Sequence, residues 1–168
     1  MRPIARLATE LTVSGAGQLA VGIAGLVIAL VADDTGAGRA IVPFAVAFLL
    51  VGAVSAYGSR WLRGAEPDGA AEGARVETAG LTVRRTLVGL VVALVAVGIA
   101  ALIGGGLAAV LGGVVAAVGA VDLANLSWVR RREAETGALI FRELGGSPFS
   151  GGRRPLYTRP RKDITLAT

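Results

Sequence analysis

The feature that most constrains this fold is a stretch of 44 residues, 86–129, that contains one charged side chain, Asp122. The stretch is divided once, by three consecutive glycines at positions 104–106. A helix needs roughly 20 mainly apolar residues to cross the hydrocarbon core of a bilayer. The stretch therefore predicts two transmembrane helices that are joined by a short hinge.

The composition of the whole chain agrees with a membrane environment. Hydrophobic residues make up 54% of the 168 residues without counting the 25 glycines, and the mean hydropathy is +0.67. Soluble domains are roughly 45–50% apolar on a count that includes glycine. A chain of this size could not hide so much apolar surface from water, so it predicts an integral membrane protein.

The first half of the chain predicts a second hairpin. Residues 11–32 and 40–59 carry no charge. Pro43 falls in the first turn of the later run, where a missing N–H costs little, and Tyr57 and Trp61 follow at its end, as in an interfacial aromatic belt. We expect the first run to be retained, because it is longer than the roughly 7–15 apolar residues of a cleaved signal.

The predicted fold class is an all-α integral membrane protein with four transmembrane helices arranged as two hairpins. The membrane domain covers residues 1–129, with an internal loop at 60–85, and its spans are about 11–32, 40–59, 86–103 and 107–129. In the tail, 130–168, we expect a short helix over 133–144 that ends at Gly145 and Gly146. The rest of the tail is rich in Gly, Pro and Arg and is expected to be mostly disordered.

The basic residues predict the orientation. Cytoplasmic segments collect Lys and Arg. If the N-terminus is cytoplasmic, 16 of the 17 basic residues lie on the cytoplasmic side and only Arg39 lies outside. We therefore expect a multi-pass protein of the inner (plasma) membrane with both termini in the cytoplasm. The preference for Arg over Lys and for Ala, Gly and Val is typical of a prokaryote with a GC-rich genome.

Small residues predict how the helices pack, because helices in lipid associate through close contact and polar groups. We expect the small residues of each span to face the other helices and the bulky ones to face lipid. The predicted inner faces are Ser14, Gly15, Gln18, Gly22, Gly25 and Ala29; Ala45, Gly52, Ser55, Ala56 and Ser59; Gly89, Ala93, Ala96, Ala100 and Gly104; and Ala108, Gly112, Val115, Gly119 and Asp122.

Asp122 is the principal candidate for a functional side chain, because an ionisable residue inside a span is costly. Gln18, Asn125, Ser55 and Tyr57 are expected near the same depth and complete a candidate intramembrane polar cluster. Three roles are open for Asp122. It could hold helices together through water, Arg84 or Arg85, act as a proton or cation relay, or contact another subunit.

Two groups of basic residues follow the last span. Arg130, Arg131 and Arg132 are expected to anchor the helix end as a stop-transfer signal. Farther along, the tail carries a second group that could bind anionic lipid headgroups or an acidic partner, or stay solvated. We do not expect nucleic acid to bind there. This second group consists of Arg153, Arg154, Arg159, Arg161 and Lys162.

The absence of Cys and His excludes several kinds of chemistry. Disulfides, Cys/His zinc sites, iron–sulfur clusters and His-ligated haem are impossible, and so are Ser–His and Cys–His nucleophile pairs. We therefore expect no catalytic residues, no metal site and no cofactor, and we do not expect an enzyme.

These observations favour a non-enzymatic accessory or scaffold subunit of a larger membrane assembly. The expected partners are the lipid bilayer and either other membrane subunits or further copies of the chain. The alternative is a small oligomeric ion- or proton-coupled transporter or channel that uses Asp122. A third possibility, a holin-like permeabilising protein, rests only on size and on the Gly/Ala-rich spans.

Overall fold

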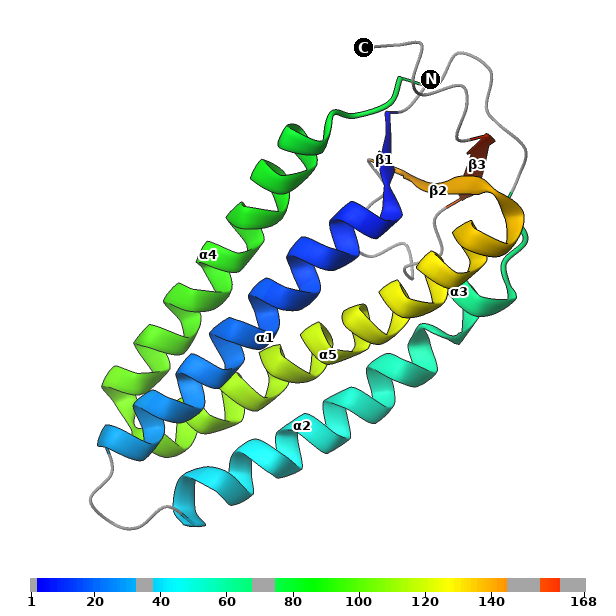
Figure 1. Ribbon diagram of the computed structural model, residues 1–168. Coiled ribbons are helices and arrows are strands. Elements are labelled where there is room, and N and C mark those ends of the chain that lie inside the picture. Colours follow the sequence, from blue (N-terminus) through cyan, green and yellow to red (C-terminus); the bar gives the residue numbers. More distant parts are fainter. Residues whose placement is uncertain (1–2, 33–37, 68–74, 145–154, 161–168) are drawn as a thin grey trace.

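The computed structural model describes residues 3–32, 38–67, 75–144 and 155–160 of the chain. The described part is mostly helical and carries a small sheet at one end (Figure 1). Four of its helices are long and apolar enough to cross a membrane, which indicates a small multi-pass membrane protein. The elements are β1 (Ile4–Arg6), α1 (Leu7–Ala32), α2 (Gly38–Gly58), α3 (Arg60–Gly64), α4 (Ala79–Ile103), α5 (Gly105–Thr136), β2 (Ala138–Glu143) and β3 (Leu156–Pro160).

Helices α1 and α5 form the centre of the bundle. Helix α4 packs mainly against α1, and α2 packs mainly against α5 (Figure 1). Gly104 alone separates α4 from α5, so the two helices form the hairpin that the three glycines predict. Many large apolar side chains of α2 and α4 are exposed on the surface of the bundle, among them Leu49, Val54 and Val92. In a bilayer these side chains meet lipid.

The contact between α1 and α5 brings the two backbones close together. A Cβ atom added to Gly22 would lie 2.5 Å from the carbonyl oxygen of Gly112 and 2.5 Å from the Cβ of Ala116. A Cβ on Gly119 would lie 2.6 Å from the backbone nitrogen of Leu19. No larger residue fits at these positions without moving a helix, as expected where small residues mediate helix association in membranes.

Helix α4 packs in a different way. Two side chains of α4 fill the space over glycines of α1. A Cβ on Gly17 would lie 2.3 Å from the Leu90 side chain, and a Cβ on Gly25 would lie 2.9 Å from the Val97 side chain. The grooves are thus provided by α1 and filled by the larger side chains of α4. On the other side of the bundle, Phe44 of α2 packs against the start of α5 in the cluster that includes Ala109. The two backbones also approach closely there, because a Cβ on Gly113 would lie 2.4 Å from the carbonyl oxygen of Phe44.

The predicted small-residue faces hold for α1 and α5 but are wrong in part for α2 and α4. Ala45 and Ala56 of α2 are exposed, and so are Gly89 and Ala96 of α4. For α4 the reason is that α1 already supplies the glycine groove, so α4 contributes bulky side chains.

A three-stranded antiparallel sheet closes one end of the bundle. Its order is β1-β2-β3, with Ile4 opposite Glu143 and Ile140 opposite Thr158. The backbone of Ile4 also bonds to the segment before α4, through Arg75 O at 3.0 Å and Glu77 N at 2.8 Å. The N-terminal strand, the chain before α4 and the chain after α5 therefore lie at the same end.

The sheet corrects two predictions for the tail. The helix expected over 133–144 is wrong, because α5 ends at Thr136 and residues 138–143 form β2. Gly137 ends the helix with φ 66°, a left-handed conformation that favours glycine, and its N–H donates to Glu133 O at 3.1 Å. The expected all-α class is also wrong, because β1, β2 and β3 are strands in a mostly helical structure. The disordered tail is wrong for β2 and β3, whereas residues 145–154 and 161–168 lie outside the described residues.

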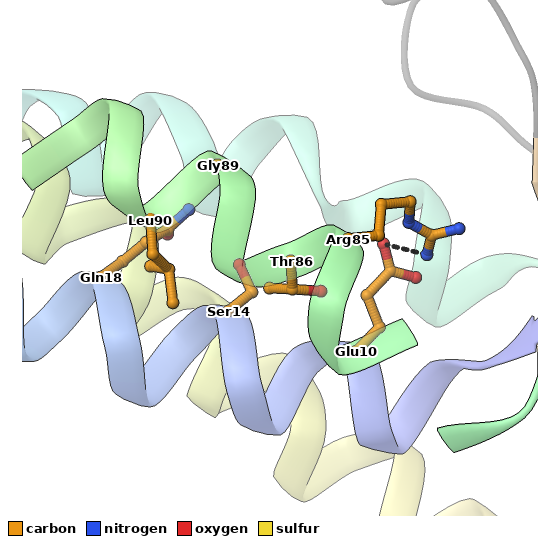
Figure 2. Close-up of a pocket in the computed structure, with 7 residues that line it drawn as sticks. All are labelled: Glu10, Ser14, Gln18, Arg85, Thr86, Gly89 and Leu90. Atoms are coloured by element: carbon orange, nitrogen blue, oxygen red, sulfur yellow. Dashed lines mark ion pairs between the residues drawn. The ribbon is translucent and has the colours of Figure 1, made fainter. Parts of the chain in front are cut away.

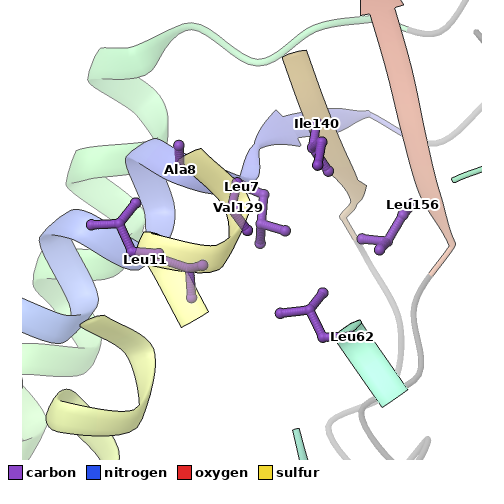
Figure 3. Packing of buried hydrophobic residues seen from close by; sticks show 8 residues of the cluster. Leu7, Ala8, Leu11, Leu62, Val129, Ile140 and Leu156 are labelled. Carbon is purple, nitrogen blue, oxygen red and sulfur yellow. The ribbon is translucent and has the colours of Figure 1, made fainter. Parts of the chain in front are cut away.

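A hydrophobic cluster joins the sheet to the bundle (Figure 3). Ile140 points from β2 toward the helices, while its neighbours Leu139 and Phe141 pack on the opposite face with Ile4. This alternation is the period of a strand with two covered faces. The cluster fixes the end of α5 against the start of α1 and consists of Leu7, Ala8, Leu11, Leu62, Leu126, Val129, Ile140 and Leu156.

We predict that Gly22→Ala lowers the free energy of unfolding by about 1–3 kcal/mol, because the new methyl group overlaps the α5 backbone. Gly98→Ala is the matched control, since no atom lies within 4 Å of a Cβ at that position of α4. Unfolding of the two variants in detergent micelles by added SDS measures the difference. Equal stability of the two variants would contradict the close contact between α1 and α5.

Candidate functional site

Asp122 of α5 makes a polar contact with α1. Its Oδ2 accepts a hydrogen bond from the hydroxyl of Ser14 at 2.8 Å. The two helices pack closely at the next residue of each. A Cβ on Gly15, which follows Ser14, would lie 2.9 Å from the side chain of Leu123, which follows Asp122. The small residues that pack the helices thus also bring the Asp122 carboxylate to its partner.

Ser14 belongs to a polar row on α1 with four-residue spacing, Glu10, Ser14 and Gln18. Residues four apart lie on one face of a helix, and this face turns toward α4 (Figure 2). A pocket of about 270 Å³ lies there. Among the described residues, no side chain or backbone group forms a hydrogen bond with the buried Oε1 of Gln18 or the buried Oε2 of Glu10. The pocket is lined by Glu10, Ser14, Gln18, Arg85, Thr86, Gly89 and Leu90.

The Glu10 carboxylate is the centre of an ion-pair network that ties the sheet to the helices. Its Oε1 accepts a hydrogen bond from Arg142 of β2 and lies 3.7 Å from Arg85 of α4. Arg85 in turn pairs with Glu77 at 3.3 Å, and the Thr82 hydroxyl donates to Glu77 at 2.8 Å. Three separate parts of the chain are thereby held around one carboxylate.

Glu133 links the end of α5 to the sheet in a similar way. Its side chain is 5% exposed and lies 3.4 Å from Arg6 of β1. Its Oε1 accepts a hydrogen bond from the backbone N–H of Ile140 at 3.0 Å. The Glu133 carboxylate therefore binds both the backbone N–H of Ile140 in β2 and the guanidinium of Arg6 in β1, close to the turn that joins α5 to the sheet.

A second pocket, of about 220 Å³, lies between the sheet and the bundle. Asp122 and Asn125 reach it from α5, and Arg142 reaches it from β2. The remaining lining residues come from α1 and from the region where α2 passes into α3. They are Leu7, Leu11, Gly58, Ser59, Trp61 and Leu62.

The structure brings part of the predicted polar cluster together. Asp122 and Asn125 line one pocket, and Gln18 lines the other pocket, between α1 and α4. Tyr57 does not join them, because it is 71% exposed and its ring lies 5.1 Å from the guanidinium of Arg60. Ser55 is half-buried on α2 and lines neither of these two pockets.

The predicted basic residues divide into two groups in the structure. Arg131 pairs with Glu135 at 2.9 Å, Arg132 lies over the Trp128 ring at 5.5 Å, and Arg130 is exposed. Arg159 lies in β3 opposite Leu139. The others, Arg153, Arg154, Arg161 and Lys162, lie outside the described residues.

Sequence reasoning missed most of the ionic partners. The sequence pattern assigns no role to Glu10 or Glu77, and it places Glu133 and Arg142 only in an expected tail helix. Arg85 was considered as a partner of Asp122, but it pairs with Glu10 and Glu77 instead. The spacing of Glu10, Ser14 and Gln18 was a usable signal, because it places three polar groups on one helical face.

We predict that Glu133→Leu lowers the free energy of unfolding by about 1–3 kcal/mol, because the buried N–H of Ile140 loses its acceptor. Glu135→Leu is the matched control. It removes an exposed ion pair on the same helix, which contributes about 0–1 kcal/mol. The same SDS titration in micelles measures both variants, and equal losses would mean that the Glu133 contacts do not hold the sheet.

Comparisons with known protein families, with characterised proteins and with solved structures give no match to this chain. Within the described ranges, the acidic side chains form no group of three that could hold a metal ion. Function is therefore inferred from the side chains of this chain and their arrangement.

Proposed function

We propose that this multi-pass membrane protein is a non-enzymatic accessory or scaffold subunit of a larger membrane assembly. The observation that carries the proposal is the closed contact along the part of the bundle farther from the sheet. There Gly22 and Gly25 of α1 meet Gly112 and Ala116 of α5 at backbone distance. This packing favours a rigid support over a conduit.

The distribution of polar side chains supports the same conclusion. Beyond the polar row on α1 and Asp122 on α5, the rest of the bundle is apolar in sequence. A proton or ion that reached Gln18 from the sheet end would find no further polar side chain along these helices. The segments without one are 19–32, 40–54, 87–103 and 105–121.

An exposed edge of α4, beside the pocket that this helix forms with α1, supports association with another membrane helix. Gly89 and Ala96 are seven residues apart, lie on the same face of the helix and are exposed. Small residues at such spacing let a second helix approach closely. A partner subunit or a second copy of this chain could therefore pack against α4.

The proposed orientation places the sheet end in the cytoplasm of a prokaryotic cell, at the inner membrane. The described basic side chains of the 60–67 and 75–85 segments lie at the sheet end, and Arg39 lies at the start of α2 at the other end. Lys and Arg favour the cytoplasmic side. Residues 153–162, with their dense positive charge, would then meet anionic headgroups of the inner leaflet.

We predict that a stoichiometric membrane partner co-purifies with the chain after gentle extraction and that Ala96→Trp removes it. The large ring would block close approach at α4 without filling a site inside the bundle. Val95→Trp is the control, since Val95 is 54% exposed on a neighbouring face of α4. Native mass spectrometry measures the complexes. A chain that runs alone in every extraction would contradict the accessory role.

A transporter remains the second candidate because of one observation, the bond from Ser14 to Asp122 beside the unpaired Gln18 oxygen. Such a group could carry a proton through part of the membrane. The transporter role requires that the purified homo-oligomer conducts ions in proteoliposomes and that Asp122→Asn abolishes the flux. An absence of flux from the unaltered protein would leave the accessory role as the better account.

A further inference from the structure

The last turns of α5, at the sheet end of the bundle (Figure 1), carry a surface pocket of about 260 Å³. Its lining residues are spaced by three or four positions and therefore share one face of the helix. Val129 and Glu133 occupy a different face, because both are buried where α5 meets the sheet. The charged side chains of the pocket are accessible, since Arg131 is 82% and Glu135 is 60% exposed. The pocket is lined by Trp128, Arg131, Arg132 and Glu135.

This face lies where α5 leaves the membrane. The 22 residues from Leu107 to Trp128 contain one charged side chain, and they rise about 32 Å along a helix. The hydrocarbon core of a bilayer is about 30 Å thick, so Trp128 reaches the interfacial region, where Trp is enriched. Arg131 and Arg132 lie about one helical turn farther out, at the level of the lipid phosphates, and Glu135 lies about one turn beyond them.

Two contacts orient the arginines and leave N–H donors available. The guanidinium of Arg132 lies 5.5 Å from the centre of the Trp128 ring, and a guanidinium that stacks on a ring can still donate in its own plane. Arg131 donates to Glu135 from Nε at 2.9 Å. In the described part of the chain, the terminal nitrogens of Arg131 and Arg132 form no ion pair. The face therefore presents two guanidinium groups to an anion at the membrane surface.

We propose that this face of α5 binds the headgroup of phosphatidylethanolamine in the leaflet at the sheet end. The lipid phosphate accepts hydrogen bonds from Arg131 and Arg132, and the lipid ammonium donates to the Glu135 carboxylate. An ion pair as exposed as that of Arg131 with Glu135 is weak, so the carboxylate can also accept from the ammonium. The Trp128 ring packs beside the glycerol esters.

The order of the charges along the helix carries this assignment. From the membrane outward, α5 presents an aromatic ring, then two cations and then an anion. A molecule of phosphatidylethanolamine presents its esters, its phosphate and its ammonium in the same direction. Arg131 and Glu135 are separated by about 6 Å along the helix axis, and this separation suits the short ethylene chain between phosphate and ammonium.

Glu135 distinguishes phosphatidylethanolamine from other phospholipids. Phosphatidylglycerol offers the same phosphate but has no cation for the carboxylate. Phosphatidylcholine has a quaternary ammonium, which carries no N–H to donate. A face that binds any anionic lipid requires only basic residues, whereas this pocket also contains an acid. The assignment does not depend on the accessory role proposed above.

The first test is lipid competition in nanodiscs. The full chain is reconstituted with equal amounts of phosphatidylethanolamine, phosphatidylglycerol and phosphatidylcholine that carry identical acyl chains, and native mass spectrometry measures the lipids that stay bound after release. We expect phosphatidylethanolamine to be retained about two- to fivefold more than either competitor, the gain from one exposed charge pair. Equal retention of the three lipids, or a preference for phosphatidylglycerol, would overturn the proposal.

The decisive variant exchanges the two charges, Arg131→Glu with Glu135→Arg. It preserves the net charge and an ion pair four residues apart, now in the order that favours a helix, so the protein should fold as well as before. The exchange places the anion at the level of the phosphate and a cation at the level of the ammonium. We expect the preference for phosphatidylethanolamine to disappear. An unchanged preference would show that the order of charges does not select the lipid.

Single substitutions assign each half of the headgroup. Glu135→Gln should lower the retention of phosphatidylethanolamine to that of phosphatidylglycerol, because only the ammonium loses its partner. Arg132→Gln should lower the retention of both lipids, because both contain a phosphate. Glu66→Gln and Arg130→Gln are the matched controls, since both residues are exposed and neither lines the pocket. If the controls change lipid retention as much as the pocket variants, retention follows net charge and the proposed site is wrong.

Discussion

Helices α1 and α5 meet at backbone distance, and this contact sets where the other helices of the bundle can pack. Gly22 and Gly112 allow the two backbones to meet, so packing between helices replaces the hydrophobic effect, which does not distinguish helix from lipid inside a bilayer. Once this pair is formed, α4 fits its larger side chains over Gly17 and Gly25 of α1. The glycines therefore determine the positions of the outer helices as well as their own.

The same contact determines where polar chemistry can exist. Toward the hinge between α4 and α5, the bundle consists of apolar side chains and glycines in close contact. Toward the sheet, α1 carries Glu10, Ser14 and Gln18 in a row, and the network around Glu10 includes Arg142 of the sheet. Glu133 of α5 accepts a hydrogen bond from Ile140 of β2, and Glu10 of α1 accepts one from Arg142 of β2. These two carboxylates therefore connect the sheet to the membrane helices.

The four long helices were predictable from the sequence, because runs such as 86–103 and 107–129 are long, uncharged and broken by glycine. The packing of α1 and α5 was also predictable, since their small residues recur at helical spacing. The exposure of Gly89 and Ala96 was not, because a stripe of small residues does not reveal which helix of a pair forms the groove. The strand at 138–143 was missed because the helix stop at Gly137 depends on a left-handed conformation that Gly145 could equally have supplied. Of the candidate site, Asp122, Gln18 and Asn125 lie at the two polar pockets, but their partners come from distant segments that pattern alone does not join.

Helix α5 lies between α1 and α2, and an engineered disulfide between α2 and α5 can check this arrangement in the membrane. A Cβ on Gly52 would lie 3.9 Å from the Cβ of Ala117, within the range of about 3.5–4.5 Å for a disulfide. The chain contains no Cys, so Gly52→Cys with Ala117→Cys gives a single possible intramolecular pair. Oxidation in isolated membranes should close this bond and leave Gly98→Cys with Ala117→Cys reduced, as measured by intact mass after thiol labelling. If the first pair stays reduced, or if both pairs oxidise equally, α5 does not occupy the centre of the bundle.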